Sequence, residues 1–270
     1  MAKKILLAAG CSYTEKDYRS GDEHIPEDQR TGWPMWPELM ANELDLKCVN
    51  TARCGAGSDF ILKEIIKGIA TYGDRIDTIA VLWSGADRES FYTFNFNAIS
   101  EIWDDPNFDP FSWMDDIGIG KVNRNYWKSR HFDPNTYKVM LENQLARMLM
   151  IIDLCKLHNI KLIMAQGLSV LNYWAINDLH KNQKINERAY IKLRPLLELY
   201  VNNPFFNKIE ENKKHIVGWP FYQELNGYFF DLLRHGNEEY YISERDRHPN
   251  KLGQELFFEE FMKGYRKVYG

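Results

Sequence analysis

Several kinds of sequence pattern are absent from this chain of 270 residues. The four cysteines, Cys11, Cys48, Cys54 and Cys155, form no C-x-x-C pair, and no Cys/His cluster has the spacing of a zinc site. No apolar run approaches the roughly 20 residues that span a bilayer. No internal repeat and no Pro/Gly/Ser-rich linker interrupts the chain. We therefore expect reduced thiols, no metal or other cofactor, no membrane segment, and one domain over residues 1–270.

Strong charge of either sign is absent as well. The net charge is −4, which argues against broad electrostatic binding of nucleic acid. A hydrophobic share of 44% and a charged share of 27% are typical of an ordinary globular protein. The start, Lys3-Lys4 followed by a short apolar run and Cys11, mimics a lipoprotein signal, but the run is shorter than the about 7–15 residues of a signal core. We expect a cytoplasmic protein.

Short apolar runs alternate with helical patterns along the whole chain. Continuous apolar runs are typical of strands buried on both faces of a parallel sheet. Strands are predicted at residues 5–9, 46–49, 78–83, 161–165 and 215–219, and helices at 37–44, 60–72, 137–158, 186–201, 221–233 and 249–269. Asp59 is the expected N-cap of the helix at 60–72. This alternation predicts an α/β fold, a flavodoxin-like three-layer α/β/α sandwich around a five-stranded parallel sheet.

Residues 91–136 differ in character from the rest of the chain. This stretch is rich in Phe, Tyr and Trp, interleaved with Asp and Asn, and has no clean helix or strand period. We interpret it as an insertion on the carboxyl side of the sheet. Two roles stay open, a lid or aromatic-walled pocket for a ligand, or a small satellite core that covers the sheet.

Two polar stretches could carry chemistry. Ser12 follows the first strand at once, where ligands of parallel sheets sit, so it is either a nucleophile or the cap of a helix. Asp246 and His248 precede the last helix, where a histidine beside a carboxylate can act as a general base. The alternative for that pair is a surface Asp–His contact beside a helix start.

Taken together, these stretches resemble the SGNH (GDSL-like) hydrolase family. Gly10-Cys-Ser12-Tyr-Thr14 is similar to its Gly-Asp-Ser-x-(Ser/Thr) block, with Cys11 where aspartate is usual, and to phage-type members that open with Gly-x-Ser-(Phe/Tyr)-(Thr/Ser). In the second block a glycine follows an asparagine by five positions, which here gives Asn50 and Gly55. Asp246-Arg-His248-Pro is similar to the last block, Asp-x-x-His-Pro.

The resemblance implies a role for each matched residue. Ser12 would be the nucleophile, His248 the general base, and Asp246 the residue that orients it. The backbone N–H groups of Ser12 and Gly55 would form part of an oxyanion hole. We further expect Tyr13, Trp83, Arg88 and Asn95 to contact the substrate.

The chain departs from the family pattern at two places. The third block ends in Gly-x-Asn-Asp, whose asparagine donates to the oxyanion, but this chain has Ala86 there, and Ser84 is the expected substitute, with Arg88 or Asn95 as alternatives. The Asp–His spacing is also one residue shorter than usual. Glu244 is therefore a competing partner for the histidine.

Two other side chains are alternative nucleophiles to Ser12. Ser169 follows a strand in Gly167-Leu-Ser169, but Leu171 replaces the last glycine of a Gly-x-Ser-x-Gly elbow. Cys11 neighbours Ser12 and would point elsewhere.

The expected function is that of an esterase which forms an acyl-enzyme, acting on a small ester such as an O-acetyl group of a carbohydrate. The alternatives are an inactive SGNH-like protein that binds a glycan or a nucleotide, and a lipid or thioester hydrolase with a more apolar pocket.

Overall fold

The computed structural model of the chain describes residues 3–85, 134–167, 202–219, 238–243, 246 and 248–270. The predicted insertion at 91–136 lies outside these residues, except that 134–136 open a helix. The helices predicted at 186–201 and 221–233, together with Ser169, Arg88, Asn95 and Glu244, also lie outside them.

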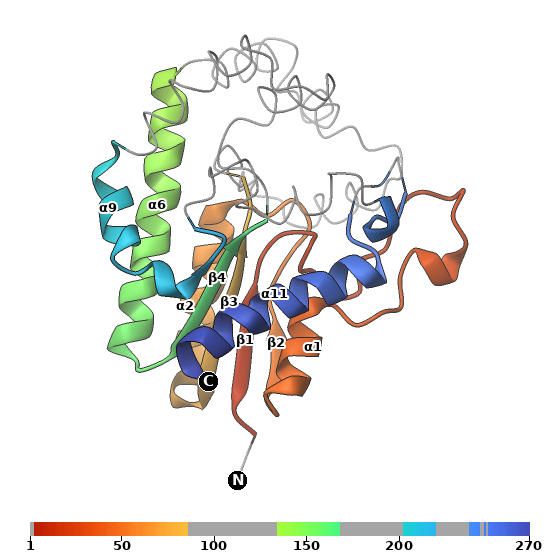
Figure 1. Cartoon of the computed structure of the whole chain (residues 1–270), viewed down its shortest axis with the longest axis horizontal. Coiled ribbons are helices and arrows are strands. Elements are labelled where there is room, and N and C mark those ends of the chain that lie inside the picture. The colour runs from red at the N-terminus through yellow and green to blue at the C-terminus, as the bar shows by residue number, and fades with distance from the viewer. Residues whose placement is uncertain (1–2, 86–133, 168–201, 220–237, 244–245, 247) are drawn as a thin grey trace.

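Five parallel strands form one sheet, as predicted (Figure 1). Their order is β2-β1-β3-β4-β5, the flavodoxin-like order, in which the chain reverses direction across the sheet between β1 and β3. The carboxyl ends of β1 and β3 are therefore the expected position of a ligand site. The strands are β1 (Ile5–Ala9), β2 (Lys47–Asn50), β3 (Ile76–Trp83), β4 (Lys161–Gln166) and β5 (Ile216–Val217).

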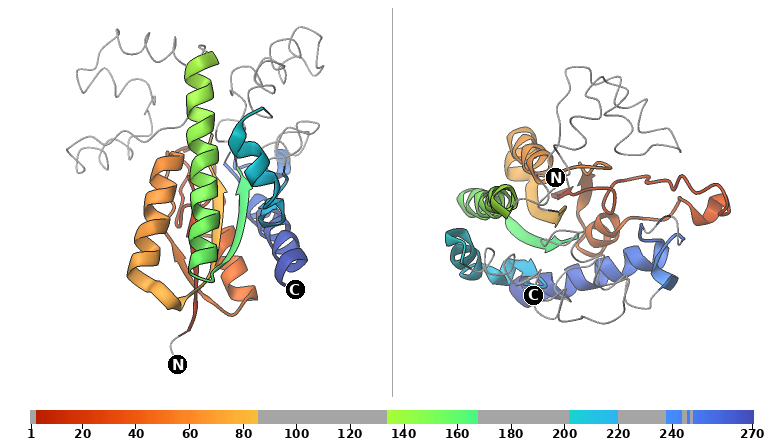
Figure 2. Two further views of the ribbon diagram at one scale, coloured as in Figure 1. Left: turned by 90° about the vertical axis from the view of Figure 1, so that its left-hand side faces the viewer. Right: turned by 90° about the horizontal axis from the view of Figure 1, so that it is seen from above.

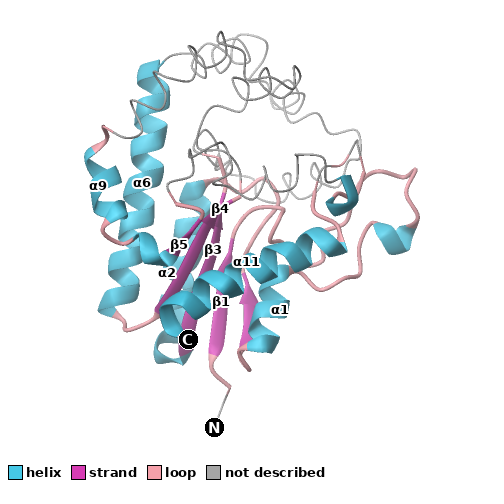
Figure 3. Ribbon diagram, in the orientation of Figure 1, coloured by secondary structure: helices cyan, strands magenta, loops and turns pink. Residues whose placement is uncertain are grey.

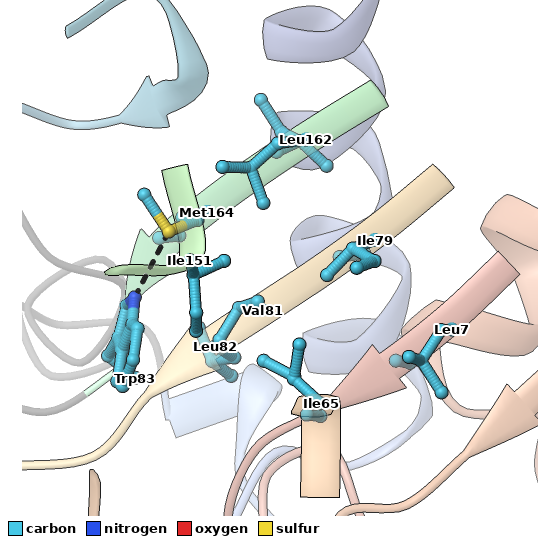
Figure 4. Packing of buried hydrophobic residues seen from close by; sticks show 14 of the residues in the cluster. Leu7, Ile65, Ile79, Val81, Leu82, Trp83, Ile151, Leu162 and Met164 are labelled. Carbon is cyan, nitrogen blue, oxygen red and sulfur yellow. Dashed lines mark hydrogen bonds between the residues drawn. The ribbon is translucent and has the colours of Figure 1, made fainter. Parts of the chain in front are cut away.

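The central strands are buried on both faces. Every residue of β1 is buried, and in β3 only Asp77 is partly exposed. Figure 4 shows side chains of β1, β3 and β4 meeting those of the covering helices, with Ile65 and Ile151 among them. Burial on both faces explains why these strands have continuous apolar runs instead of alternating ones.

Helices cover both faces of the sheet (Figures 2 and 3). α1 and α11 pack together on one face, and α2 and α6 on the other, with the short helix α9 against α6. Among the described helices, none is long and apolar enough to cross a bilayer. The helices are α1 (Trp36–Glu43), α2 (Ser58–Tyr72), α6 (Pro134–Leu157), α9 (Pro204–Glu210) and α11 (Lys251–Tyr269).

Several helix starts differ from the sequence prediction, and one short helix was not predicted. α2 begins at Ser58 with Gly57 as its N-cap, so Asp59 lies inside the first turn instead of capping it. Helix α9 was not predicted. Asn203 caps it by accepting a hydrogen bond from the Phe205 N–H, and Pro204 occupies its first position, a favourable start for so short a helix.

The contact between α1 and α11 joins the two ends of the chain. The Trp36 ring stacks on Phe261 with ring centroids 4.0 Å apart and planes 4° apart. Both side chains are fully buried. The side chain of Gln254, also fully buried, accepts a hydrogen bond from the Trp36 backbone N–H (3.0 Å) and donates to the Tyr13 carbonyl (3.2 Å). Helix α11 is thereby fixed to the segment that follows β1.

Phe261→Ala should destabilise the protein by about 3–5 kcal/mol, because it removes a buried ring and leaves Trp36 facing a cavity. Urea unfolding followed by circular dichroism measures the loss. Leu252→Ala on the same helix is the control, since Leu252 is 47% exposed and its truncation should cost far less. Equal losses of unfolding free energy in the two variants would contradict a stabilising role of the Trp36–Phe261 contact.

Candidate active site

The turn after β1 places Ser12 at the carboxyl edge of the sheet. The Cys11 carbonyl accepts hydrogen bonds from the N–H groups of Thr14 (2.9 Å) and Glu15 (3.1 Å), which closes a single tight turn around Ser12. A methyl group at Gly10 would overlap the Thr14 hydroxyl and lie 3.1 Å from the Leu82 carbonyl. Glycine is therefore required for the chain to turn so closely against β3.

Ser12 caps none of the described helices. Its hydroxyl oxygen instead lies 2.8 Å from Nε2 of His248, which is 236 residues away in the sequence. The neighbouring Cys11 thiol is fully buried in the core cluster, so it is not a competitor for the same position.

Asp246 occupies the other side of the imidazole. Its Oδ1 lies 2.5 Å from His248 Nδ1 and also accepts a hydrogen bond from the His248 backbone N–H (3.1 Å). An aspartate that accepts from the N–H two residues on forms an Asx-turn. This turn explains how an Asp-x-His spacing, one residue shorter than the family pattern, brings the carboxylate to Nδ1.

The proton positions follow from the partners. An ionised carboxylate only accepts hydrogen bonds, so Nδ1 carries the proton that points to Asp246. The Nε2 nitrogen of the neutral ring is then an acceptor facing the Ser12 hydroxyl. The His248 side chain is 27% exposed, so the imidazole is partly accessible to solvent.

The electrostatic surroundings keep Asp246 ionised. Burial alone would raise the pKa of this carboxyl. The hydrogen bond and the charge of His248, with a further hydrogen bond from Ser20, outweigh burial and lower the pKa of Asp246 to about 2, from an ordinary value of 3.8.

The loop after β2 carries Gly55. The backbone N–H of Arg53 donates to the Gly10 carbonyl (3.2 Å). The backbone N–H of Ala56 donates to the Arg53 carbonyl (3.1 Å), which closes a turn with Gly55 as its third residue. Gly55 has φ +72°, a conformation that glycine adopts without strain. Within the described ranges, the backbone N–H groups of Ser12 and Gly55 donate no hydrogen bond.

Glu15 links this loop to the Ser12 turn. Burial raises the pKa of the Glu15 carboxyl, while a hydrogen bond from the Cys54 N–H and the charges of Arg53 and His248 oppose that rise. The carboxyl therefore lies among groups of both loops. Asn50 adds a second link, since its side-chain amide donates to the Thr14 carbonyl (2.5 Å).

Ser84 follows β3 and is fully buried. Its carbonyl accepts hydrogen bonds from the side-chain amides of Gln166 (2.6 Å) and Gln144 (3.4 Å). The Ser84 hydroxyl is buried and has no hydrogen-bond partner among the residues that the structure describes. A buried hydroxyl without a partner is unusual in a folded protein and marks a donor that a bound group could use.

The two predicted substrate contacts within the described ranges lie in the interior. Trp83 is fully buried, and its indole N–H points to the Met164 sulfur at 3.4 Å (Figure 4). Trp83 is the last residue of β3 and its side chain lies in the core, and its contact with a substrate stays a prediction. The Tyr13 ring lies nearly perpendicular to the His248 imidazole, with ring centroids 5.2 Å apart. It also packs on the Phe257 ring of α11, with centroids 6.2 Å apart, so it links the imidazole to this helix.

Residues that the sequence reasoning missed complete the site. Tyr18 and Ser20 contact Asp246, and Gln254 fixes the Tyr13 carbonyl. Tyr18 and Ser20 stand in a polar loop without periodicity, so no sequence signal marked them. Within the described ranges, no three His, Cys, Asp or Glu residues gather as metal ligands would.

The known proteins found to be similar to this chain are solved structures of low sequence identity. No protein-family profile matches it, and no curated protein does. Solved structures that match nearly the whole chain include a protein described as a lipolytic protein of the G-D-S-L family from Desulfitobacterium hafniense (12% identity, 97% of this chain and 99% of that one, TM-score 0.45). They also include the psychrotrophic esterase EstA from Pseudoalteromonas sp. (12%, 98% and 98%, 0.45) and the acetylxylan esterase Axe2 from Geobacillus stearothermophilus (14%, 97% and 94%, 0.43). The activities in these names belong to those proteins.

Asp246 should make stability depend on pH. Because its pKa is lowered in the folded state, its contribution of about 2 kcal/mol is present above pH ~4 and is lost as the pH falls toward ~2. The gap in unfolding free energy between the wild type and Asp246→Asn should narrow by about 1 kcal/mol from pH ~5 to pH ~3. Urea unfolding at a series of pH values measures it.

Asp153→Asn is the matched control for this pH series. Asp153 lies on α6 with its side chain 77% exposed, so the gap between this variant and the wild type should stay nearly constant. A gap for Asp246→Asn that also stays constant with pH would show that His248 and Ser20 do not stabilise the ionised carboxylate.

Proposed function

We propose that the chain is a serine ester hydrolase that works through an acyl-enzyme. The observation that carries the proposal is the continuous contact from the Ser12 hydroxyl to His248 Nε2 at 2.8 Å, and from His248 Nδ1 to Asp246 at 2.5 Å. A serine hydroxyl is a poor nucleophile by itself and becomes effective when a base lies within hydrogen-bond reach. The base here is in turn oriented by a carboxylate.

In the proposed reaction, the Ser12 oxygen attacks the carbonyl carbon of the ester while His248 Nε2 takes its proton. Asp246 stabilises the imidazolium through Nδ1–H. The carbonyl π bond becomes an oxyanion, which then re-forms the carbonyl as the alcohol leaves with the proton from His248. A water molecule, deprotonated by the same nitrogen, attacks the acyl group and releases the acid and Ser12.

Three donors are proposed for the oxyanion. Within the described ranges, the N–H groups of Ser12 and Gly55 have no acceptor and the buried Ser84 hydroxyl has no partner. Ser84 would replace the asparagine that the family pattern has and this chain lacks. It follows β3, the strand next to β1 in the sheet, at the edge where Ser12 lies.

The proposed substrate is a small ester, such as an O-acetyl group on a carbohydrate. Ser12 is only 4% exposed, which favours a short acyl group over a bulky one. A histidine base oriented by a carboxylate activates a serine without a metal or an organic cofactor.

Ser12→Ala should lower the turnover of p-nitrophenyl acetate by about a thousandfold or more, since removing the nucleophile leaves only the rate that binding and the oxyanion donors supply. A serine-directed phosphonate should add its mass to the peptide that contains Ser12 in the wild type only. His248→Gln should cause a similar loss of turnover. His215→Gln, a change at a half-buried histidine bonded to Tyr269 on α11, should leave the turnover intact.

A folded wild-type protein that is neither labelled nor active on short acyl esters would refute the hydrolase proposal. Glycan or nucleotide binding that survives Ser12→Ala in such a protein would then favour a binding protein.

Ser84→Ala should lower kcat by about ten- to a hundredfold with little change in KM, because an oxyanion donor acts in the transition state and not on the bound ester. Steady-state kinetics on p-nitrophenyl acetate separates the two constants. Unchanged kcat would remove Ser84 from the proposed hole, while leaving the roles of Ser12 and His248 untouched.

A further inference from the structure

The loop that follows the Ser12 turn runs beside the segment that carries Asp246 and His248 (Figure 1). Ser243 donates a hydrogen bond from its hydroxyl to Asp22 (2.7 Å), and the Asp246 N–H bonds that same hydroxyl (2.9 Å). Ser20 and Tyr18 each contact Asp246 directly. The two segments, more than 220 residues apart in sequence, thus form one hydrogen-bonded unit.

Tyr18 makes the most extensive contact in this unit. Its ring stacks on the His248 imidazole, with centroids 4.3 Å apart and planes 27° apart. Its hydroxyl lies 3.1 Å from Asp246 Oδ2 and 2.8 Å from His248 Nδ1. One side chain therefore covers a face of the base and touches both members of the Asp–His pair.

The proton arrangement of these three groups is determined by their chemistry. The Nδ1 proton points to Asp246 Oδ1, so the Tyr18 oxygen beside Nδ1 can only accept a share of that proton. The Tyr18 O–H then donates to Asp246 Oδ2. Burial, followed by the charge of Asp246, raises the pKa of Tyr18, so the hydroxyl keeps its proton.

The backbone before Tyr18 has an uncommon conformation. Asp17 has φ +61°, in the left-handed region that aspartate tolerates better than most residues. The Ser20 N–H is held by the Arg30 carbonyl (3.1 Å). The loop is therefore fixed on both sides of Tyr18 by local features that do not involve His248.

We propose that Tyr18 is a positioning residue, which holds the imidazole of His248 and the carboxylate of Asp246 in one plane and shields the proton between them from water. The proposal rests on the proposed function of Ser12, His248 and Asp246. Oδ1 of Asp246 is occupied by His248, and Tyr18 occupies Oδ2, so the carboxylate cannot rotate away from Nδ1. The Tyr13 ring lies nearly perpendicular to the imidazole, whereas the Tyr18 ring is stacked on it.

The test compares Tyr18→Phe, which keeps the ring and removes the hydroxyl, with Tyr18→Leu, which removes both. On p-nitrophenyl acetate, we expect kcat to fall about tenfold in Tyr18→Phe, as for a lost hydrogen bond to a charged group, with KM nearly unchanged. In Tyr18→Leu we expect a loss of about a hundredfold, since the ring that holds the base is gone. Tyr72→Phe on α2 is the matched control and should behave as the wild type.

A second measurement does not depend on turnover. The proton on His248 Nδ1 should give a far-downfield NMR signal in the wild type that is absent from His248→Gln. We expect this signal to shift in Tyr18→Phe and to be lost to exchange with water in Tyr18→Leu. The groups that face this ring and could also move the signal are Asp246, Glu15 and Tyr13, and all three are unchanged in the two variants.

Three results would overturn the proposal. One is a wild-type kcat and NMR signal in both Tyr18 variants. Another is a rise in KM with kcat unchanged, which would make Tyr18 a substrate contact. The third is the absence of any protected Nδ1 signal in the wild type. A wild-type protein without esterase activity, but with the signal changes described, would instead refute the proposed function and leave the positioning role of Tyr18 supported.

Discussion

A buried amide ties the last helix of this protein to the turn that contains Ser12. The Gln254 side chain accepts a hydrogen bond from the Trp36 N–H and donates to the Tyr13 carbonyl. Gln254 and Tyr13 follow His248 and Ser12 closely in sequence, so this bridge helps to hold the two side chains near each other.

The strands could be predicted from sequence because burial on both faces leaves a continuous apolar run, as at Ile79 to Leu82. The positions of Ser12, Gly55 and His248 could be predicted because each follows or precedes an element with a recognisable pattern. The structure brings Ser12, His248 and Asp246 together, and it places Gly55 at positive φ in a turn attached to β1.

Other parts of the site could not be predicted, for physical reasons. Trp83 is the last residue of a strand, and the sequence does not indicate whether its side chain lies in the core or at the open edge of the sheet. Tyr18 and Ser20 act through contacts with residues more than 220 positions away, and local sequence carries no trace of such contacts. The Asp-x-His spacing is one residue shorter than the family pattern, but an Asx-turn, in which the Asp246 carboxylate accepts from the His248 N–H, still brings this carboxylate to Nδ1.

The two halves of the site are attached to the protein in different ways. Ser12 leaves β1, an interior strand paired on both sides and buried throughout. The segment around His248 is held by the bridge between Tyr241 and Pro249 and by the side chain of Asn250, which donates to the Glu239 and Tyr241 carbonyls. Local opening of such a segment requires far less free energy than unfolding of the sheet. The segment that carries His248 can therefore move away from Ser12 while the sheet stays intact, so the contact between these two side chains can break in a local opening that leaves the fold in place.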